Sequence, residues 1–172
     1  RIAVDGSGHC YATGITLSSG WVSGGWDTSH NGNYDGYVVK LSATGAHQWS
    51  TYLGGTGSDS GLGIAVDGSG NCYATGYTES SGWVSGGWDT SQNGDRDGYV
   101  VKLSATGAHL WSTYLGGTSW DSGGGIAVDG SGNCYATGRT ESSGWVSGGW
   151  DTSYNGDRDG YVVKLSATGA HL

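Results

Sequence analysis

The heptapeptide Ile64-Ala65-Val66-Asp67-Gly68-Ser69-Gly70 occurs three times in the sequence, and this repetition is the main evidence for the fold. It stands at Ile2–Gly8 and again at Ile126–Gly132, so the spacing is 62 residues. Aligning residues 2–63 on residues 64–125 leaves ten mismatches, and aligning 64–110 on 126–172 leaves two. Such a period is typical of one supersecondary unit that buries its apolar face only against its neighbours. The sequence therefore divides into repeats 1–63, 64–125 and 126–172, the third of them incomplete.

Each repeat is expected to form four strands. In the middle copy, the apolar run 63–67 is followed by a glycine-rich turn and by residues 72–75, which alternate between two faces. Residues 99–103 are β-branched and aromatic, and residues 109–115 alternate again. No stretch has apolar residues at helical spacing. Four antiparallel strands per repeat predict an all-β chain of β-propeller-type blades in tandem.

The composition supports a folded chain and excludes some partners. There are 37 Gly and no Pro, Met or Phe, but also nine Trp and eleven Tyr. The aromatic side chains supply apolar surface, so the glycines indicate turns rather than disorder. The net charge of −8 argues against nucleic acid and anionic membranes, and no apolar run is long enough to span a bilayer.

One cysteine occurs at the same place in each copy, at Cys10, Cys72 and Cys134. The expected role is that of a small buried apolar side chain. Equivalent residues of sheets packed about 10 Å apart cannot form a disulfide, which needs Cα atoms within about 7 Å. The thiols therefore do not indicate the redox compartment.

Three blocks carry a family resemblance. They are Gly-Ile-Ala-Val-Asp-Gly-Ser-Gly-Asn-Cys-Tyr-Ala-Thr-Gly at 63–76, Asp-Gly-Tyr-Val-Val-Lys-Leu at 97–103 and Trp-Ser-Thr-Tyr-Leu-Gly-Gly at 111–117. Their order and spacing resemble the bacterial SBBP repeat, a β-propeller repeat. Cys72 departs from the aliphatic residue usual in that family, and the segment Trp83–Trp88 replaces a region that often carries Phe-Pro. The resemblance implies a blade of a large secreted or surface-attached protein, without a defined activity.

Fewer than three complete blades cannot close a ring, since propellers use about four to eight. An open row exposes an apolar face at each end, which is an interface for assembly. Identical blades make identical interfaces, and contacts that do not close give filaments. Both ends of the sequence look cut from something longer. We expect self-association, either within a longer propeller, between copies of the chain, or as an open filament-forming array.

An acidic loop in each copy is a candidate calcium site. In the segment 89–97, oxygen-bearing side chains stand at the first, third, fifth and ninth positions, with Gly at the sixth. This spacing resembles the calcium loops of integrin-type propellers, although the twelfth position is Val100 rather than a bidentate Glu. The alternative is a turn whose side chains hydrogen-bond the backbone. The candidate ligands are Asp27, Ser29, Asn31, Asp35, Asp89, Ser91, Asn93, Asp97, Asp151, Ser153, Asn155 and Asp159.

Paired tryptophans in a glycine-rich segment are a candidate sugar site. Indoles can stack on sugar rings, and they can equally cover the edge of a blade. The sequence leaves both interpretations open. The candidate ligand-binding residues are Trp21, Trp26, Trp83, Trp88, Trp145 and Trp150.

Some positions differ between the copies in ways that do not conserve volume. Ile15 becomes Tyr77 and Arg139, and Ser58 becomes Trp120. Position 34 is Tyr and then Arg, and position 30 is His, Gln and then Tyr. Such side chains are expected to point to solvent, beside the long polar segment, which would be the recognition surface.

Catalysis has little support in the sequence. His47, His109 and His171 stand in identical contexts, and no nucleophile elbow, zinc motif or phosphate loop is present. We therefore expect a non-catalytic extracellular structural or adhesive repeat protein, without a certain cofactor, that assembles through blade-to-blade contacts. The alternative is a carbohydrate-binding propeller that uses the tryptophan loop. An enzyme whose catalytic blades lie outside these residues is a third option.

Overall fold

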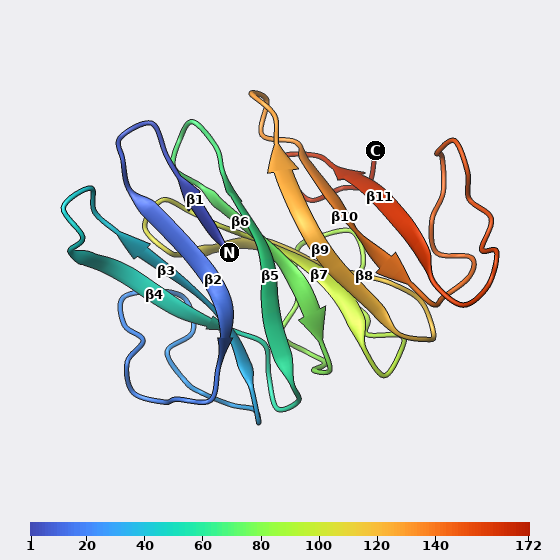
Figure 1. The fold of residues 1–172 in the computed structure, drawn as a ribbon, viewed down its shortest axis with the longest axis horizontal. Helices are drawn as coiled ribbons and strands as arrows, with labels where there is room; N and C mark the ends of the chain where they lie inside the picture. The colour runs from blue at the N-terminus through green and yellow to red at the C-terminus, as the bar shows by residue number, and fades with distance from the viewer.

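The computed structural model describes all 172 residues, as eleven β-strands and no helix. They form three separate antiparallel sheets that follow one another along the long axis of the molecule (Figure 1). The strands are β1 (Ile2–Val4), β2 (Cys10–Thr16), β3 (Asp35–Leu41), β4 (His47–Leu53), β5 (Asp59–Val66), β6 (Cys72–Thr78), β7 (Asp97–Leu103), β8 (His109–Leu115), β9 (Asp121–Val128), β10 (Cys134–Thr140) and β11 (Asp159–Leu165).

Each sheet is a meander, because its strands are hydrogen-bonded in chain order. The first two sheets have four strands each, which confirms the predicted blade. The third has three strands, and a single bridge joins Leu165 to His171, where the second blade begins its fourth strand. No ladder of paired strands continues from one sheet into the next. The molecule is therefore an open row of propeller-type blades.

The sheets begin at Asp59 and Asp121, earlier than the repeat boundaries at 64 and 126 that the sequence suggested. Strand β5 bulges between Gly61 and Gly63, and beyond the bulge Asp59 still pairs with Thr78 of β6. The segment 59–63 contains two glycines and no alternating pattern, so a strand could not be predicted there. The period of 62 residues is unaffected.

The tight turn between the first two strands of each blade is built by one aspartate. In the second blade, Asp67 Oδ1 accepts hydrogen bonds from the backbone amides of Ser69 and Asn71, each at 2.9 Å. Gly70 has a φ of +78°, a conformation that side-chain-bearing residues rarely adopt. These hydrogen bonds also lower the pKa of Asp67 despite partial burial, which favours the charged carboxylate that holds the turn.

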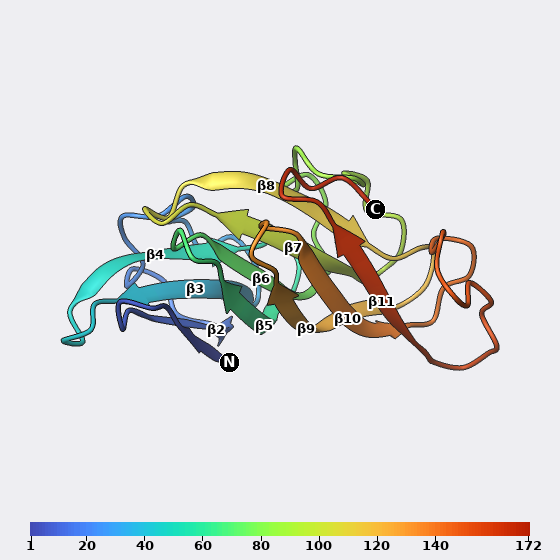
Figure 2. The same ribbon diagram turned by 90° about the horizontal axis from the view of Figure 1, so that it is seen from above.

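The blades pack face to face, and the core of the molecule lies between them (Figure 2). Strand β5 packs against β1, β2 and β3 of the first sheet, and β9 packs against β5, β6 and β7 of the second. One apolar cluster fills the first junction and another fills the second junction. Each blade therefore depends on its neighbour for its core, as expected for a repeat array.

The cysteines are free, and Cys72 and Cys134 are buried in these two clusters. Burial raises the pKa of both thiols, so they remain protonated and unreactive at neutral pH. Among the elements of the fold there is no helix with the length and apolar character needed to cross a membrane.

Candidate functional site

Every blade presents two chemically distinct faces. The face covered by the following blade, which we call the forward face, carries Tyr11, Val38, Trp49 and Leu53 in the first blade and Tyr73, Val100, Trp111 and Leu115 in the second. The opposite face, which we call the rear face, carries Cys72, Ala74, Tyr99, Val101 and Leu103 in the second blade and Cys134, Ala136, Tyr161, Val163 and Leu165 in the third. The two junctions are therefore built from the same residue types at the same repeat positions.

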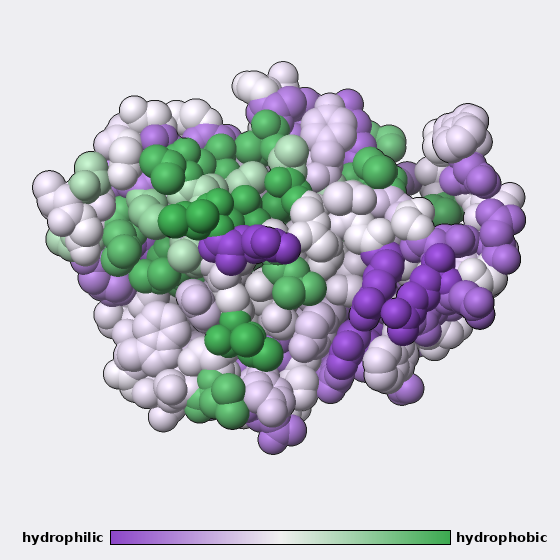
Figure 3. Space-filling model, in the orientation of Figure 1, coloured by the Kyte–Doolittle hydropathy of each residue, from purple (hydrophilic) through white to green (hydrophobic).

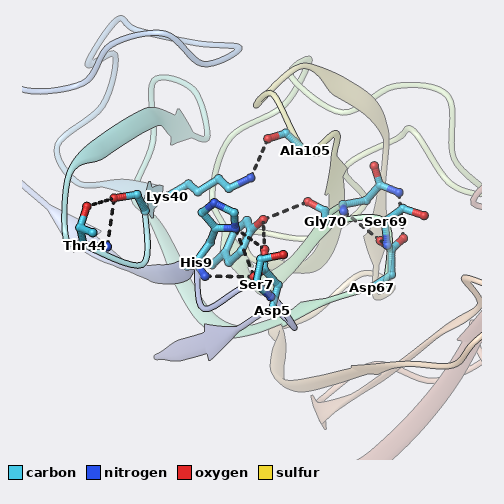
Figure 4. Close-up of polar contacts among 12 residues, drawn as sticks. Asp5, Ser7, His9, Lys40, Thr44, Asp67, Ser69, Gly70 and Ala105 are labelled. Carbon is cyan, nitrogen blue, oxygen red and sulfur yellow. Dashed lines mark hydrogen bonds and ion pairs between the residues drawn. The ribbon is translucent and has the colours of Figure 1, made fainter.

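Hydrogen bonds fasten the forward face to turns of the following blade. Lys40 Nζ donates to the carbonyl oxygen of Ala105 at 3.1 Å (Figure 4). Trp49 Nε1 donates to the same oxygen at 3.0 Å. Tyr11 Oη donates to the carbonyl oxygen of Gly70 at 3.2 Å. These donors bond to carbonyl groups in turns of the following blade. They therefore fix the register of one blade on the next, and they also stabilise the junction. We call this set of bonds the clasp.

The clasp recurs at the second junction with almost the same distances. Lys102 Nζ and Trp111 Nε1 donate to Ala167 O, each at 3.0 Å, and Tyr73 Oη donates to Gly132 O at 3.1 Å. The clasp residues were not predicted from the sequence. The available signal was a lysine in an otherwise apolar strand, Tyr-Val-Val-Lys-Leu, unchanged in all three copies.

A buried carboxylate anchors the connection from each blade to the next. Asp59 accepts hydrogen bonds from the hydroxyls of Thr78 and Ser80 and from the amide of Gly55 at 2.9 Å. Asp121 repeats this arrangement with Thr140 and Ser142. Burial raises the pKa of Asp59, although its hydrogen-bond donors oppose the rise.

At the two ends of the molecule the same faces lie open. Val162 on the third blade is 73% exposed, whereas Val100, its counterpart on the second, is fully buried. Tyr135 is also exposed, and Ile2 and Val4 are exposed on the rear face of the first blade. Figure 3 shows apolar side chains gathered over the first sheet. The rear face of the first blade thus repeats its half of the internal junction uncovered, whereas the forward face of the third blade repeats only the part carried by β10 and β11, without counterparts of Trp111 and Leu115.

The tryptophan loops pack against their own blade and the following one. Trp21, Trp83 and Trp145 make edge-to-face contacts with Tyr37, Tyr99 and Tyr161, at ring distances of 5.3, 5.1 and 4.9 Å. Trp26 stacks on His109 at 4.2 Å, and Trp88 stacks on His171 at 4.4 Å. Trp150, the counterpart of Trp26 and Trp88, is fully exposed at the open end. Five of the six indoles therefore make aromatic contacts within the molecule, although Trp21, Trp26 and Trp88 remain 40, 37 and 38% exposed.

The acidic loops are held by their own hydrogen bonds. In the second blade, Asp89 accepts the amide of Ser91 at 2.9 Å and the side-chain amide of Asn93 at 3.0 Å. Asp97 accepts the amide of Asn93 at 2.8 Å, and its Oδ1 is buried without a partner. The first blade repeats the pattern with Asp27, Ser29, Asn31 and Asp35. In the third, Asp151 and Asp159 accept the amides of Ser153 and Asn155.

This arrangement favours the structural turn over a calcium loop. One oxygen of Asp89 and one of Asp97 accept backbone amides, and the second oxygen of Asp89 accepts the side-chain amide of Asn93, whereas Asp97 Oδ1 has no partner. No three His, Cys, Asp or Glu side chains gather where they could hold a metal ion. Calcium binding stays a prediction.

The residues that vary between copies form a contact cluster at the second junction. The guanidinium of Arg96 lies between the rings of Tyr77 and Trp120, at 4.1 and 4.6 Å, and pairs with Glu79 at 2.5 Å. Tyr77 and Arg96 are half-buried and Trp120 is exposed. The prediction that these positions face solvent therefore fits Trp120, whereas Tyr77 and Arg96 are partly covered by their mutual stacking.

The comparisons with known proteins agree with this architecture. The β-propeller repeat family SBBP matches residues 48–82 and 110–144, which begin in the last strand of one blade and end beyond β6 or β10 of the next. The chain is also 31% identical over 127 residues to the regulatory protein FlaEY of Caulobacter vibrioides. That alignment covers 67% of this chain but only 12% of FlaEY, so the chain spans a small part of that protein. The chain belongs to the SBBP β-propeller repeat family.

Proposed function

We propose that the chain is a non-catalytic scaffold whose end blades associate head to tail, the forward face of the third blade docking on the rear face of the first blade of another copy. The observation that carries this proposal is the likeness of the two internal junctions, together with the uncovered rear face of the first blade and the uncovered forward side of β10 and β11 in the third. A third junction of the same kind would bury Val162 and Tyr135 against Ile2 and Val4.

The polar contacts of such a junction follow from the clasp. Tyr135 Oη would donate to the carbonyl of Gly8, and Lys164 Nζ to the carbonyl of Ala43, because these are the counterparts of the internal partners. Trp150 would stack on His47, as Trp26 stacks on His109. Because each junction repeats the same operation, association does not need to close and would extend the row.

The extracellular structural or adhesive role belongs to the same proposal and rests on the SBBP resemblance. An antibody against the chain, applied to intact and to permeabilised cells of the source bacterium, tests the location. Signal that requires permeabilisation would remove the adhesive role and leave the scaffold.

Self-association is tested by sedimentation velocity across a range of concentrations, with electron microscopy of the largest species. We expect the average mass to rise with concentration and the particles to be linear or curved rows. Val162→Glu places a charge on the open forward face and should give a folded monomer. Leu110→Glu makes the same kind of change on an exposed residue of β8 and should associate like the native chain.

A native chain that stays monomeric at every concentration would refute the proposal. So would association that Val162→Glu leaves unchanged. The sugar-binding alternative relies chiefly on Trp150, since the other five indoles pack within the molecule. Saturable quenching of Trp fluorescence by a glycan, lost in Trp150→Ala, would favour that alternative.

A further inference from the structure

The differences between copies are concentrated at one end of the blades. This end, which we call the loop rim, is where β2, β6 and β10 end and β3, β7 and β11 begin. Seven of the ten differences between the first two copies lie there, as do both differences between the second and third. In the first copy the seven positions are Ile15, Leu17, His30, Asn33, Tyr34, Gly57 and Ser58.

Three of these positions are neighbours in space at each junction. Tyr34 forms a parallel bridge with Ser58, and the carbonyl of Ser58 accepts the amide of Glu79, the counterpart of Leu17, at 3.1 Å. At the second junction Arg96 bridges with Trp120, whose carbonyl accepts the amide of Glu141 at 2.9 Å. Backbone hydrogen bonds thus carry the loop rim from blade to blade as one surface.

The chemistry of this surface changes from one end to the other. On the first blade, Ile15, Leu17 and Tyr34 are 44, 67 and 40% exposed, which makes an apolar patch. On the second, the stack of Tyr77, Arg96 and Trp120 combines aromatic rings with a paired charge.

The third blade contributes two guanidinium groups to the loop rim. Arg139 is exposed and has no ion pair, and Arg158 pairs with Glu141 at 2.8 Å. The loop rim therefore runs from apolar through aromatic to mixed charge, with Arg139 as the one guanidinium that has no ion pair, while most of the frame beneath it is unchanged.

A periodic ligand does not fit this gradient. A regular polysaccharide presents the same unit to each blade and would be matched by the same side chains in each. Several of the residues at the varying positions are of types enriched at protein interfaces, namely Tyr34, Tyr77, Arg96, Trp120, Arg139 and Arg158. Glu79 holds Arg96 in place between its two rings, so part of this surface is ordered before any ligand arrives.

We propose that the loop rim binds a segment of another protein that places apolar side chains over the first blade and a carboxylate over Arg139 of the third. Sheets packed about 10 Å apart put the outer blades about 20 Å from each other, which an extended segment spans with about six residues. The apolar end of the segment would lie on Ile15, Leu17 and Tyr34, and its carboxylate would pair with the free guanidinium of Arg139.

The repeats themselves supply the variant that tests this. The rim-exchange variant combines Ile15→Tyr, Leu17→Glu, Tyr34→Arg and Ser58→Trp. It gives these four positions the residues of the next copy, where the fold already accommodates them. The matched control, His9→Asn with Gln48→Leu, makes the equivalent exchange at variable positions outside the loop rim. The probe is a phage-displayed library of random peptides selected on the native chain, with affinities measured on synthetic copies of the selected peptides.

We expect the selected peptides to combine apolar residues at one end with Asp or Glu at the other. Their affinity should fall by about tenfold or more in the rim-exchange variant and in Arg139→Ala, and stay unchanged in the control variant. Peptides without this pattern, or peptides that bind the native and rim-exchange chains equally, would overturn the proposal. Saturable binding of polygalacturonate that is lost in the rim-exchange variant, with no peptide selected, would replace it with a glycan site.

Discussion

The second and third blades contain the same strand, Asp-Gly-Tyr-Val-Val-Lys-Leu, in two different environments. In β7 every residue of this strand is buried, whereas in β11 Val162 is exposed. The two strands have the same sequence, but β7 is covered by the third blade and paired with β8 along its length, whereas β11 has no following blade and only a single bridge to His171. The difference in exposure therefore comes from the neighbouring blade and the neighbouring strand, and not from the strand itself. The core of this protein is thus a property of the junction and not of the repeat, as nearest-neighbour descriptions of repeat proteins assume.

The clasp shows the same contrast in its polar atoms. Tyr73 Oη donates to Gly132 of the next blade, whereas Tyr135 Oη bonds only Asp129 of its own turn. The same substitution made at equivalent positions of two blades therefore separates the stability that comes from the blade itself from the stability that comes from its neighbour.

The largest expected effect comes from placing a charge in the second junction. Val100→Asp buries a carboxylate among apolar side chains and should lower the free energy of unfolding by about 4 kcal/mol or more. Val162→Asp makes the same change where the side chain is exposed, and should alter the free energy by less than about 0.5 kcal/mol. Urea denaturation of both variants measures the difference. Similar losses in the two variants would show that the blade, and not the junction, carries the stability.

The next effect removes one hydroxyl from the clasp. Tyr73→Phe deletes the hydrogen bonds to Gly132 and Asp67 and should cost about 1 kcal/mol, since a buried carbonyl is left without its donor. Tyr135→Phe loses only an exposed bond to Asp129 and should cost less. Thermal unfolding of the two variants under the same conditions makes the comparison. A larger loss in Tyr135→Phe would mean that the internal turn, and not the clasp, needs the hydroxyl.

Much of this fold could be predicted from the sequence, because the strands that alternate or carry β-branched residues are visible as patterns. The segment Asp59–Gly63 was missed as part of a strand, since glycines leave no alternation and the signal there is a buried carboxylate. The clasp was missed because its partners lie about one repeat apart, and nothing in Lys40 itself indicates a carbonyl acceptor at Ala105.

The candidate sites could be predicted only in part. Variation between copies pointed to positions 34, 58 and their counterparts, but the stacking of Arg96 between two rings required coordinates. The tryptophan loop could not be assigned from the sequence, because a packed indole and a sugar-binding indole look alike until its neighbours are known. His109, which stacks on Trp26 although it lies more than one repeat further along the chain, is such a neighbour.

A smaller effect is expected in the pH dependence of the stability, through the buried carboxylate of Asp97. Burial raises the pKa of Asp97 to about 6, above the value of about 3.9 in an unfolded chain. The folded state therefore holds this proton more tightly, and the stability it contributes is complete below about pH 4 and is lost as the pH rises through about 6. We expect the free energy of unfolding to increase by about 1 kcal/mol between pH 7 and pH 5, after allowance for solvent screening.

Asp97→Asn should flatten this pH dependence, because it removes the titrating group and keeps an acceptor for the amide of Asn93. Below about pH 4 the trend should reverse, since Asp5 has a pKa lowered to about 2 by its hydrogen bonds to Ser7, His9 and Tyr11 despite some desolvation. Urea titrations at several pH values measure both trends. A native profile that falls steadily from pH 7 to pH 5 would contradict the assignment to Asp97.

The smallest effect is expected from calcium, and it again contrasts the second blade with the third. In the second loop Asn93 donates its side-chain amide to Asp89, whereas in the third loop Asp151 accepts only the backbone amide of Ser153. Because the loop carboxylates already have backbone donors, we expect added calcium to produce no saturable heat in calorimetry and no change in melting temperature. Heat that disappears in Asp97→Ala would restore the calcium hypothesis for the covered loops. Heat that disappears only in Asp159→Ala would place the ion in the acidic loop of the third blade, which no following blade contacts. It would show that either a neighbouring blade or a bound cation can order this loop.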